Sequence, residues 1–192
     1  EYMDFTGTQL LIAAVECNHS PDNGRLREYS PFPFDDPKLG HFPGLGRKTM
    51  EWMIGSFKKD IDSRFRTLAD RENTFIAGSS MGGLMSLYAV LEFNRVFSRA
   101  AALSPSIWVA PEKLERLVRR ADLRPDTVVY MDYGSREING RAGMLRSLGR
   151  MASLLMERRV LVSSRIVPGG EHCEASWERQ IPFFMNTLLY RQ

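Results

Sequence analysis

The chain has 192 residues, 43% of them hydrophobic and 26% charged, which is typical of one globular domain over residues 1–192. Its net charge of +3 comes from interspersed basic and acidic residues, which argues against a nucleic-acid-binding surface. No apolar run approaches the roughly 20 residues that span a bilayer, so no membrane partner is expected either.

The predicted elements alternate between strands and helices. A continuous apolar run at residues 8–16 has the length of a strand that is covered on both faces. The prolines and aromatic residues of residues 18–46 predict a long loop that is packed and not disordered. Apolar residues at helical spacing between residues 50 and 61 then indicate a helix, and residues 74–77 a second strand.

The second half of the chain continues this alternation. A glycine turn leads into a helix that extends to about residue 91, and further strands are predicted at residues 99–104, 126–134 and 160–170. Helices are predicted at residues 111–120 and 143–159, and a final one at residues 174–190 is interrupted near Pro182. This order predicts a mostly parallel central sheet with helices on both faces. Functional groups in such sheets gather in the loops after the carboxyl ends of the strands.

The turn at residues 78–82 fits the pattern G-x-S-x-G with Ser80 in the centre. A strand that turns at once into a helix lifts the side chain of its central residue clear of the sheet, and Gly78 and Gly82 leave room for the crossing. The amide of Met81, at the start of the helix, is expected to bind an oxyanion that forms beside Ser80. A phosphate-binding loop would need G-K-[ST] or G-x-G-x-x-G, and neither pattern occurs here.

A serine nucleophile needs a base, and the base needs an orienting acid. His172 follows the fifth predicted strand, in the chain order that α/β-hydrolases use, whereas the other two histidines lie in the long loop. Two acids are candidates: Asp132 lies within or at the edge of the fourth predicted strand, and Glu137 lies in the loop beyond Gly134. We favour Glu137, because it lies where the chain is free to bend toward the histidine.

Together these residues resemble the putative-esterase family of α/β-hydrolases, which includes enterochelin, feruloyl and acetyl-xylan esterases, S-formylglutathione hydrolases and mycolyl transferases. The similarity extends over "NGRLREYSPF", "AGSSMGGLMSLYAVLEF", "LSPSIWV", "DYGSRE" and "GGEHCEASWERQIPFF". Aligning "DYGSRE" with the acid loop of the family implies that Glu137 is the acid. The family normally has strands upstream of "QLLIAAVE", with an Asp-Gly turn that can supply a second oxyanion donor. We therefore expect N-terminal strands to be missing from this chain.

The resemblance implies an α/β-hydrolase fold and a serine carboxylic-ester hydrolase that needs no cofactor or metal. We expect a small-molecule ester, or one linked to a carbohydrate or siderophore, to contact Ser106, Trp108 and Arg25. A binding or scaffold protein without a working oxyanion hole is the alternative, as is an acyltransferase with the same nucleophile. The two sparse cysteines are typical of a reducing compartment and so of a cytoplasmic protein. The oligomeric state is not predicted.

Overall fold

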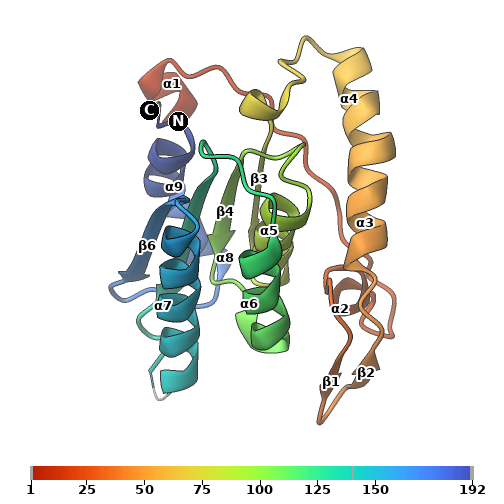
Figure 1. Ribbon diagram of the computed structural model, residues 1–192, viewed down its shortest axis with the longest axis vertical. Coiled ribbons are helices and arrows are strands. Elements are labelled where there is room, and N and C mark those ends of the chain that lie inside the picture. Colours follow the sequence, from red (N-terminus) through yellow and green to blue (C-terminus); the bar gives the residue numbers. More distant parts are fainter. Residues whose placement is uncertain (1, 140, 191–192) are drawn as a thin grey trace.

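The computed structural model describes residues 2–139 and 141–190, and Figure 1 shows a twisted sheet with helices on both sides. The strands are β1 (Phe34–Asp36), β2 (Gly40–Phe42), β3 (Phe75–Ser79), β4 (Arg99–Leu103), β5 (Val128–Gly134) and β6 (Leu161–Val167). The α-helices are α1 (Tyr2–Thr6), α2 (Gly24–Glu28), α3 (Gly46–Trp52), α4 (Lys58–Arg64), α5 (Met81–Glu92), α6 (Pro111–Arg120), α7 (Ala142–Glu157), α8 (Glu174–Glu178) and α9 (Ile181–Leu188). A π-helical turn, η1 (Met53–Phe57), and two 3₁₀ turns, η2 (Arg71–Asn73) and η3 (Ile107–Val109), complete the set.

The central sheet has the order β3-β4-β5-β6, and all of its strands are parallel. Ser79 is in register with Leu103, and Leu103 with Asp132, so the carboxyl ends of β3, β4 and β5 lie at one edge. The chain therefore has the α/β-hydrolase type of fold that its sequence predicts. A separate two-stranded antiparallel sheet, β1-β2, lies within residues 18–46.

The two central strands, β4 and β5, are covered on both faces, which explains why they are largely apolar at successive positions, whereas β3 and β6 are only partly buried. In β5, Val129 and Met131 belong to the larger core, which also contains the buried residues of α5, α6 and α7. Tyr130 faces the opposite way, into a smaller cluster with Leu188 of α9 and Phe184. The final helix is interrupted near Pro182 as predicted, because α8 ends at Glu178 and α9 begins at Ile181.

The long loop at residues 18–46 is packed, as its aromatic residues predict. Phe34 and Phe42 are both buried, and their rings stack with centroids 4.7 Å apart. The ring of Phe34 also meets Trp108 edge to face at 6.0 Å. This contact joins the β1-β2 hairpin to the loop that follows β4.

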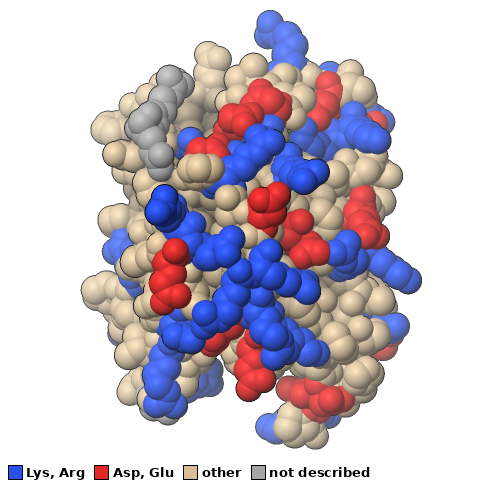
Figure 2. All heavy atoms as spheres, in the orientation of Figure 1, with Lys and Arg blue, Asp and Glu red and all other residues tan. Residues whose placement is uncertain are grey.

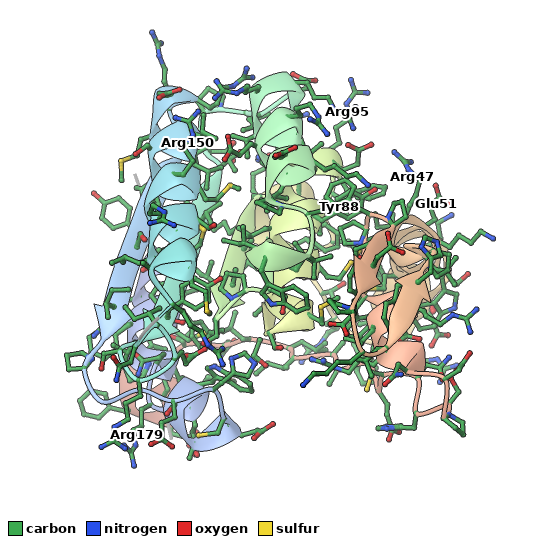
Figure 3. The ribbon with its side chains drawn as sticks, turned by 90° about the horizontal axis from the view of Figure 1, so that it is seen from below. Arg47, Glu51, Tyr88, Arg95, Arg150 and Arg179 are labelled. Carbon is green, nitrogen blue, oxygen red and sulfur yellow. The ribbon has the colours of Figure 1, made fainter. Side chains whose placement is uncertain are left out.

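The predicted helix around residues 50–61 forms as one continuous rod of α3, η1 and α4, which stands beside the body of the protein in Figure 1. Its first turn contacts α5, because the guanidinium of Arg47 pairs with Glu92 of α5 and also with Glu51 of α3 itself. Figure 3 shows Arg47 and Glu51 close to Tyr88 of α5. The other end of the rod has no buried residue of its own.

The prediction of a strand at residues 8–16 is wrong. These residues have no regular secondary structure, and none of the described residues pairs with the outer edge of β3. A groove of about 1510 Å³ lies between residues 10–15 and the edge of β3, and the apolar face of the η1–α4 segment also lines it. An apolar run becomes a strand only when a neighbouring strand satisfies its amides and carbonyls.

Lys and Arg side chains gather in Figure 2 on the face where α6 and α7 lie, with Asp and Glu among them. In α6, Arg116, Arg119 and Arg120 are exposed while Leu114 and Leu117 are buried. The basic run is thus the solvated side of an amphipathic helix. In the part of the chain that the structure describes, no helix is both long enough and apolar enough to cross a membrane.

Candidate active site

Ser80 occupies the sharp turn between β3 and α5 with φ 57° and ψ −119°, a backbone conformation that is costly for a residue with a side chain. Three backbone hydrogen bonds hold it there. The Ser80 amide donates to the Leu103 carbonyl at 2.9 Å. The Ser80 carbonyl accepts from the amides of Leu84 at 3.1 Å and Ser106 at 3.0 Å. Strained residues held in this way concentrate at functional sites, and Ser80 is where the motif predicts one.

Glycine is required at this turn at Gly78, as the motif suggests, and at Gly83, but not at Gly82. A Cβ on Gly78 would lie 2.6 Å from the carbonyl carbon of Gly82, and a Cβ on Gly83 would lie 2.9 Å from the Leu103 oxygen. A Cβ on Gly82 would meet nothing within 4 Å. The expectation that Gly82 must itself lack a side chain is therefore wrong. Its backbone fills the space beside Gly78, and Gly83 provides the close contact with the neighbouring strand.

His172 lies on the loop between β6 and α8 and faces Ser80 across the edge of the sheet. Its Nε2 is 3.0 Å from the Ser80 Oγ, which is hydrogen-bond distance. The indole of Trp177 meets the imidazole edge to face, with ring centroids 5.0 Å apart. The His172 side chain remains 47% exposed, so a small molecule can approach this pair of side chains from solvent.

Glu137 lies on the other side of the imidazole, with its Oε2 2.7 Å from the His172 Nδ1. Its second oxygen, Oε1, accepts hydrogen bonds from the Ser104 hydroxyl at 2.6 Å and the Gly134 amide at 2.8 Å. Burial raises the pKa of Glu137, but the hydrogen bonds from His172, Ser104 and Gly134 outweigh burial and leave the pKa below its usual value. The carboxylate is therefore ionised while it faces the imidazole.

Asp132, the other candidate for the acid, lies within β5 and is only 1% exposed. Its carboxylate accepts from the Ser104 amide at 3.1 Å and from the Tyr130 hydroxyl at 2.8 Å. Burial is the main reason why the pKa of Asp132 is raised. No hydrogen bond joins Asp132 to His172 in the described part of the chain, so the structure brings Glu137 to the imidazole and keeps Asp132 away from it.

The loops that carry Glu137 and His172 are joined to each other. A Cβ on Gly134 would lie 2.3 Å from the carbonyl carbon and oxygen of Gly170, so the two backbones touch. The Arg136 amide donates to the Gly170 carbonyl at 3.0 Å, and the Arg136 side chain pairs with Glu171 at 2.5 Å. The separation of Glu137 and His172 is therefore fixed by the contact between the loops as well as by their own hydrogen bond.

The remaining predicted residues lie at different distances from this cluster. Met81 is the first residue of α5, where backbone amides lack helical partners. Ser106 is buried, and its amide contacts Ser80, whereas Trp108 is 52% exposed two residues further on. Arg25 lies in α2 over the ring of Tyr29, and no described hydrogen bond or ion pair joins it to the cluster.

Two residues that the sequence did not single out complete the cluster. Ser104 bonds to Glu137 through its hydroxyl, and it also accepts from the Trp177 indole N–H at 2.9 Å. Ser104 could have been identified from its position directly after β4, because β4 lies beside β5, the strand that leads to the acid. Within residues 2–139 and 141–190 no group of three or more His, Cys, Asp or Glu is placed to hold a metal ion.

A serine hydroxyl, an imidazole and a carboxylate in this order can move the serine proton to the imidazole.

The model of the family described as "Putative esterase" matches residues 52–184 of this chain. The uncharacterized protein YbbA of Bacillus subtilis (strain 168) is 27% identical over 132 residues, which are 67% of this chain and 50% of that protein. The chain thus spans about half the length of this curated relative.

Solved structures share the fold at lower identity. An IroE-like serine hydrolase from Shewanella oneidensis superimposes with a TM-score of 0.68 at 19% identity, covering 88% of this chain and 58% of the other. The enterobactin esterase FES from Shigella flexneri, whose structure was determined in the presence of enterobactin, gives a TM-score of 0.64 at 19% identity. That match covers 74% of this chain and 37% of the esterase.

Proposed function

The chain belongs to the putative esterase family, and we propose that it is a serine carboxylic-ester hydrolase that works through an acyl-enzyme. The observation that carries this proposal is the continuous hydrogen-bonded path from Ser80 through His172 to Glu137, with distances of 3.0 Å and 2.7 Å. We call these three residues the proposed triad. Their geometry meets the requirement that a nucleophile contacts its base and the base contacts its orienting group.

In the proposed reaction the Ser80 Oγ attacks the carbonyl carbon of the ester while the His172 Nε2 takes the hydroxyl proton. Glu137 stabilises the imidazolium that forms and holds its Nδ1–H. His172 then gives the proton to the departing alkoxide, and the alcohol leaves an acyl group on Ser80. A water molecule, deprotonated by His172, attacks the acyl carbon and releases the acid together with free Ser80.

The Met81 amide is the proposed oxyanion donor. It lies at the N-terminus of α5, a helix of 12 residues, where the helix dipole also favours negative charge. The Ser80 amide is not available for this role, because it donates to the Leu103 carbonyl at 2.9 Å. The helix terminus thus provides one donor directly beside the nucleophile.

We further propose a small-molecule ester as substrate, with siderophore-linked esters as the first class to test, because the enterobactin esterase FES shares the fold. Trp108 is the proposed contact for the substrate. The Ser106 amide donates to the Ser80 carbonyl at 3.0 Å, which brings η3 beside the nucleophile, and Trp108 is exposed there. Exposed aromatic rings of this kind bind apolar or aromatic groups of ligands.

The test is hydrolysis of a panel of p-nitrophenyl, feruloyl and siderophore esters by the unmodified protein and by Ser80→Ala and Ser79→Ala. Turnover of at least one ester that is lost in Ser80→Ala and retained in Ser79→Ala supports the proposal. Turnover that survives Ser80→Ala would remove Ser80 from the mechanism. The absence of turnover in the unmodified protein would favour a binding protein, and acyl transfer to an alcohol in preference to water would favour an acyltransferase.

A further inference from the structure

Ser104 lies directly after β4 in a position that few serines occupy. Its φ of 43° is in the left-handed region, and its side chain is almost wholly inside the protein, with 2% exposure. Its amide donates to both the main-chain oxygen and the carboxylate of Asp132, each at 3.1 Å. The backbone of β5 therefore fixes Ser104 firmly, and its hydroxyl points to the acid loop.

The direction of the Ser104 hydroxyl is fixed by its two neighbours. The Trp177 indole N–H can only donate, so at 2.9 Å the Ser104 Oγ must accept from it. A carboxylate can only accept, so at 2.6 Å the single hydroxyl proton of Ser104 must point to Glu137 Oε1. The hydrogen bonds thus run in one direction, from Trp177 through Ser104 to Glu137.

From this geometry we infer that Ser104 is a positioning residue for the acid of the proposed triad, and that Trp177 orients its hydroxyl. This inference rests on the proposed function. Glu137 Oε1 receives the Ser104 hydroxyl and the Gly134 amide, which leaves Oε2 to face the His172 Nδ1 at 2.7 Å. Ser104, together with the Gly134 amide, therefore holds the Glu137 carboxylate in the orientation that meets the imidazole, and no described hydrogen bond joins Ser104 to His172 itself.

Trp177 links the two ends of this arrangement, because its ring meets the imidazole edge to face while its N–H contacts Ser104. His172, Glu137, Ser104 and Trp177 form a closed ring of contacts that draws on three segments of the chain. A group held from both sides loses little freedom during the reaction, which is the advantage of a preorganised site.

The first test compares Ser104→Ala with Ser98→Ala. Ser98 is also a fully buried serine, but it precedes β4 at the opposite end of the strand. Loss of one hydrogen bond to a charged group corresponds to about a 10- to 100-fold effect, so kcat should fall by that factor in Ser104→Ala. The KM should change less than about twofold, and Ser98→Ala should keep the activity of the unmodified protein.

The second test asks whether Ser104 acts through Glu137. In a Glu137→Gln background, adding Ser104→Ala should reduce kcat by less than about threefold, because residues that act as one unit are not additive. Trp177→Phe keeps an aromatic ring beside His172 but removes the indole N–H together with part of the ring, so it should lower kcat more in the parent than in Ser104→Ala, where the N–H has no hydroxyl to orient. The double variant Ser104→Ala/Trp177→Phe has no indole N–H that would be left without a hydrogen-bond acceptor. A loss of stability from such an unpaired group therefore does not affect its kcat.

The third test is a proton NMR measurement that needs no substrate. The low-field proton resonance of the His172–Glu137 hydrogen bond should move or broaden in Ser104→Ala and stay unchanged in Ser98→Ala. The inference would be wrong if Ser104→Ala lowered kcat as much in the Glu137→Gln background as in the parent, or if the resonance were unchanged in Ser104→Ala. Neither result would contradict the proposed esterase activity. An unmodified protein that turns over no ester would overturn both proposals, so the two failures are distinguishable.

Discussion

Replacing Gly134 by alanine tests whether the contact between the acid loop and the histidine loop sets the geometry of the site. The new Cβ would lie 2.3 Å from the carbonyl carbon and oxygen of Gly170, about 1.1 Å inside the 3.4 Å at which ordinary contact begins. Both of these Gly170 atoms are backbone and cannot rotate away, and the new Cβ would also lie 2.9 Å from the Glu137 Oε1. The two loops must therefore separate by roughly 1 Å.

Separating the two loops would lengthen the hydrogen bond between Glu137 and His172, which is 2.7 Å in the unmodified protein. A misplacement of about 1 Å can cost about 100-fold in rate, so we expect kcat/KM to fall by that order. Overpacking costs about 1–3 kcal/mol of unfolding free energy. For a protein of this size the Tm should then fall by about 2–12 °C.

The assays are hydrolysis of a short-chain p-nitrophenyl ester and thermal unfolding followed by circular dichroism. Gly149→Ala is the matched control, because Gly149 is an exposed residue of α7 whose Cβ would meet nothing within 4 Å. Alanine should raise stability there by up to about 1 kcal/mol without changing the rate. A Gly134→Ala variant with full activity and an unchanged Tm would show that the contact between the two loops does not set the geometry of the site.

Two further predictions concern Glu137 and a third concerns Arg71, a buried arginine outside the site. Glu137→Gln should lower kcat/KM by at least about 100-fold, and Asp132→Asn should lower it far less; steady-state rates decide, and the reverse ranking would move the acid to Asp132. Because the pKa of Glu137 lies below its usual 4.5, its ionised form stabilises the fold above about pH 4.5, and this stability is lost as the pH falls through the lowered pKa. Urea unfolding of the unmodified protein and Glu137→Gln should therefore differ more at pH 7 than at pH 3, and a difference that does not vary with pH would contradict this sign. Arg71→Met should cost about 3 kcal/mol in urea unfolding, because the buried guanidinium bonds to Asn94, Asp126 and Thr127; a loss below about 1 kcal/mol would show that these bonds contribute little.

The parts of the site that depend on local sequence could be predicted. Ser80 is recognisable because a strand, a tight turn and a helix follow one another within a few residues. The positions of His172 and Glu137 in loops after strands follow from the parallel order of the sheet. Their mutual distance does not, because it depends on the backbone contact between Gly134 and Gly170.

The features that could not be predicted depend on partners that are distant in the sequence. Residues 8–16 are apolar enough for a strand, but among the described residues no strand pairs with them. Ser104 and Trp177 are 73 residues apart, and neither has a motif that announces their hydrogen bond. The need for glycine at position 83, where a Cβ would approach the Leu103 oxygen, likewise depends on the neighbouring strand.

The most direct measurement of the central claim is covalent labelling by a serine-reactive phosphonate, followed by peptide mapping with mass spectrometry. Because the Ser80 Oγ lies 3.0 Å from the His172 Nε2, Ser80 should be the activated serine. We expect one adduct on Ser80, none on the adjacent Ser79, and a loss of labelling in His172→Ala. An adduct on another serine, or labelling of Ser80 at the same rate in His172→Ala, would contradict the claim that His172 activates Ser80.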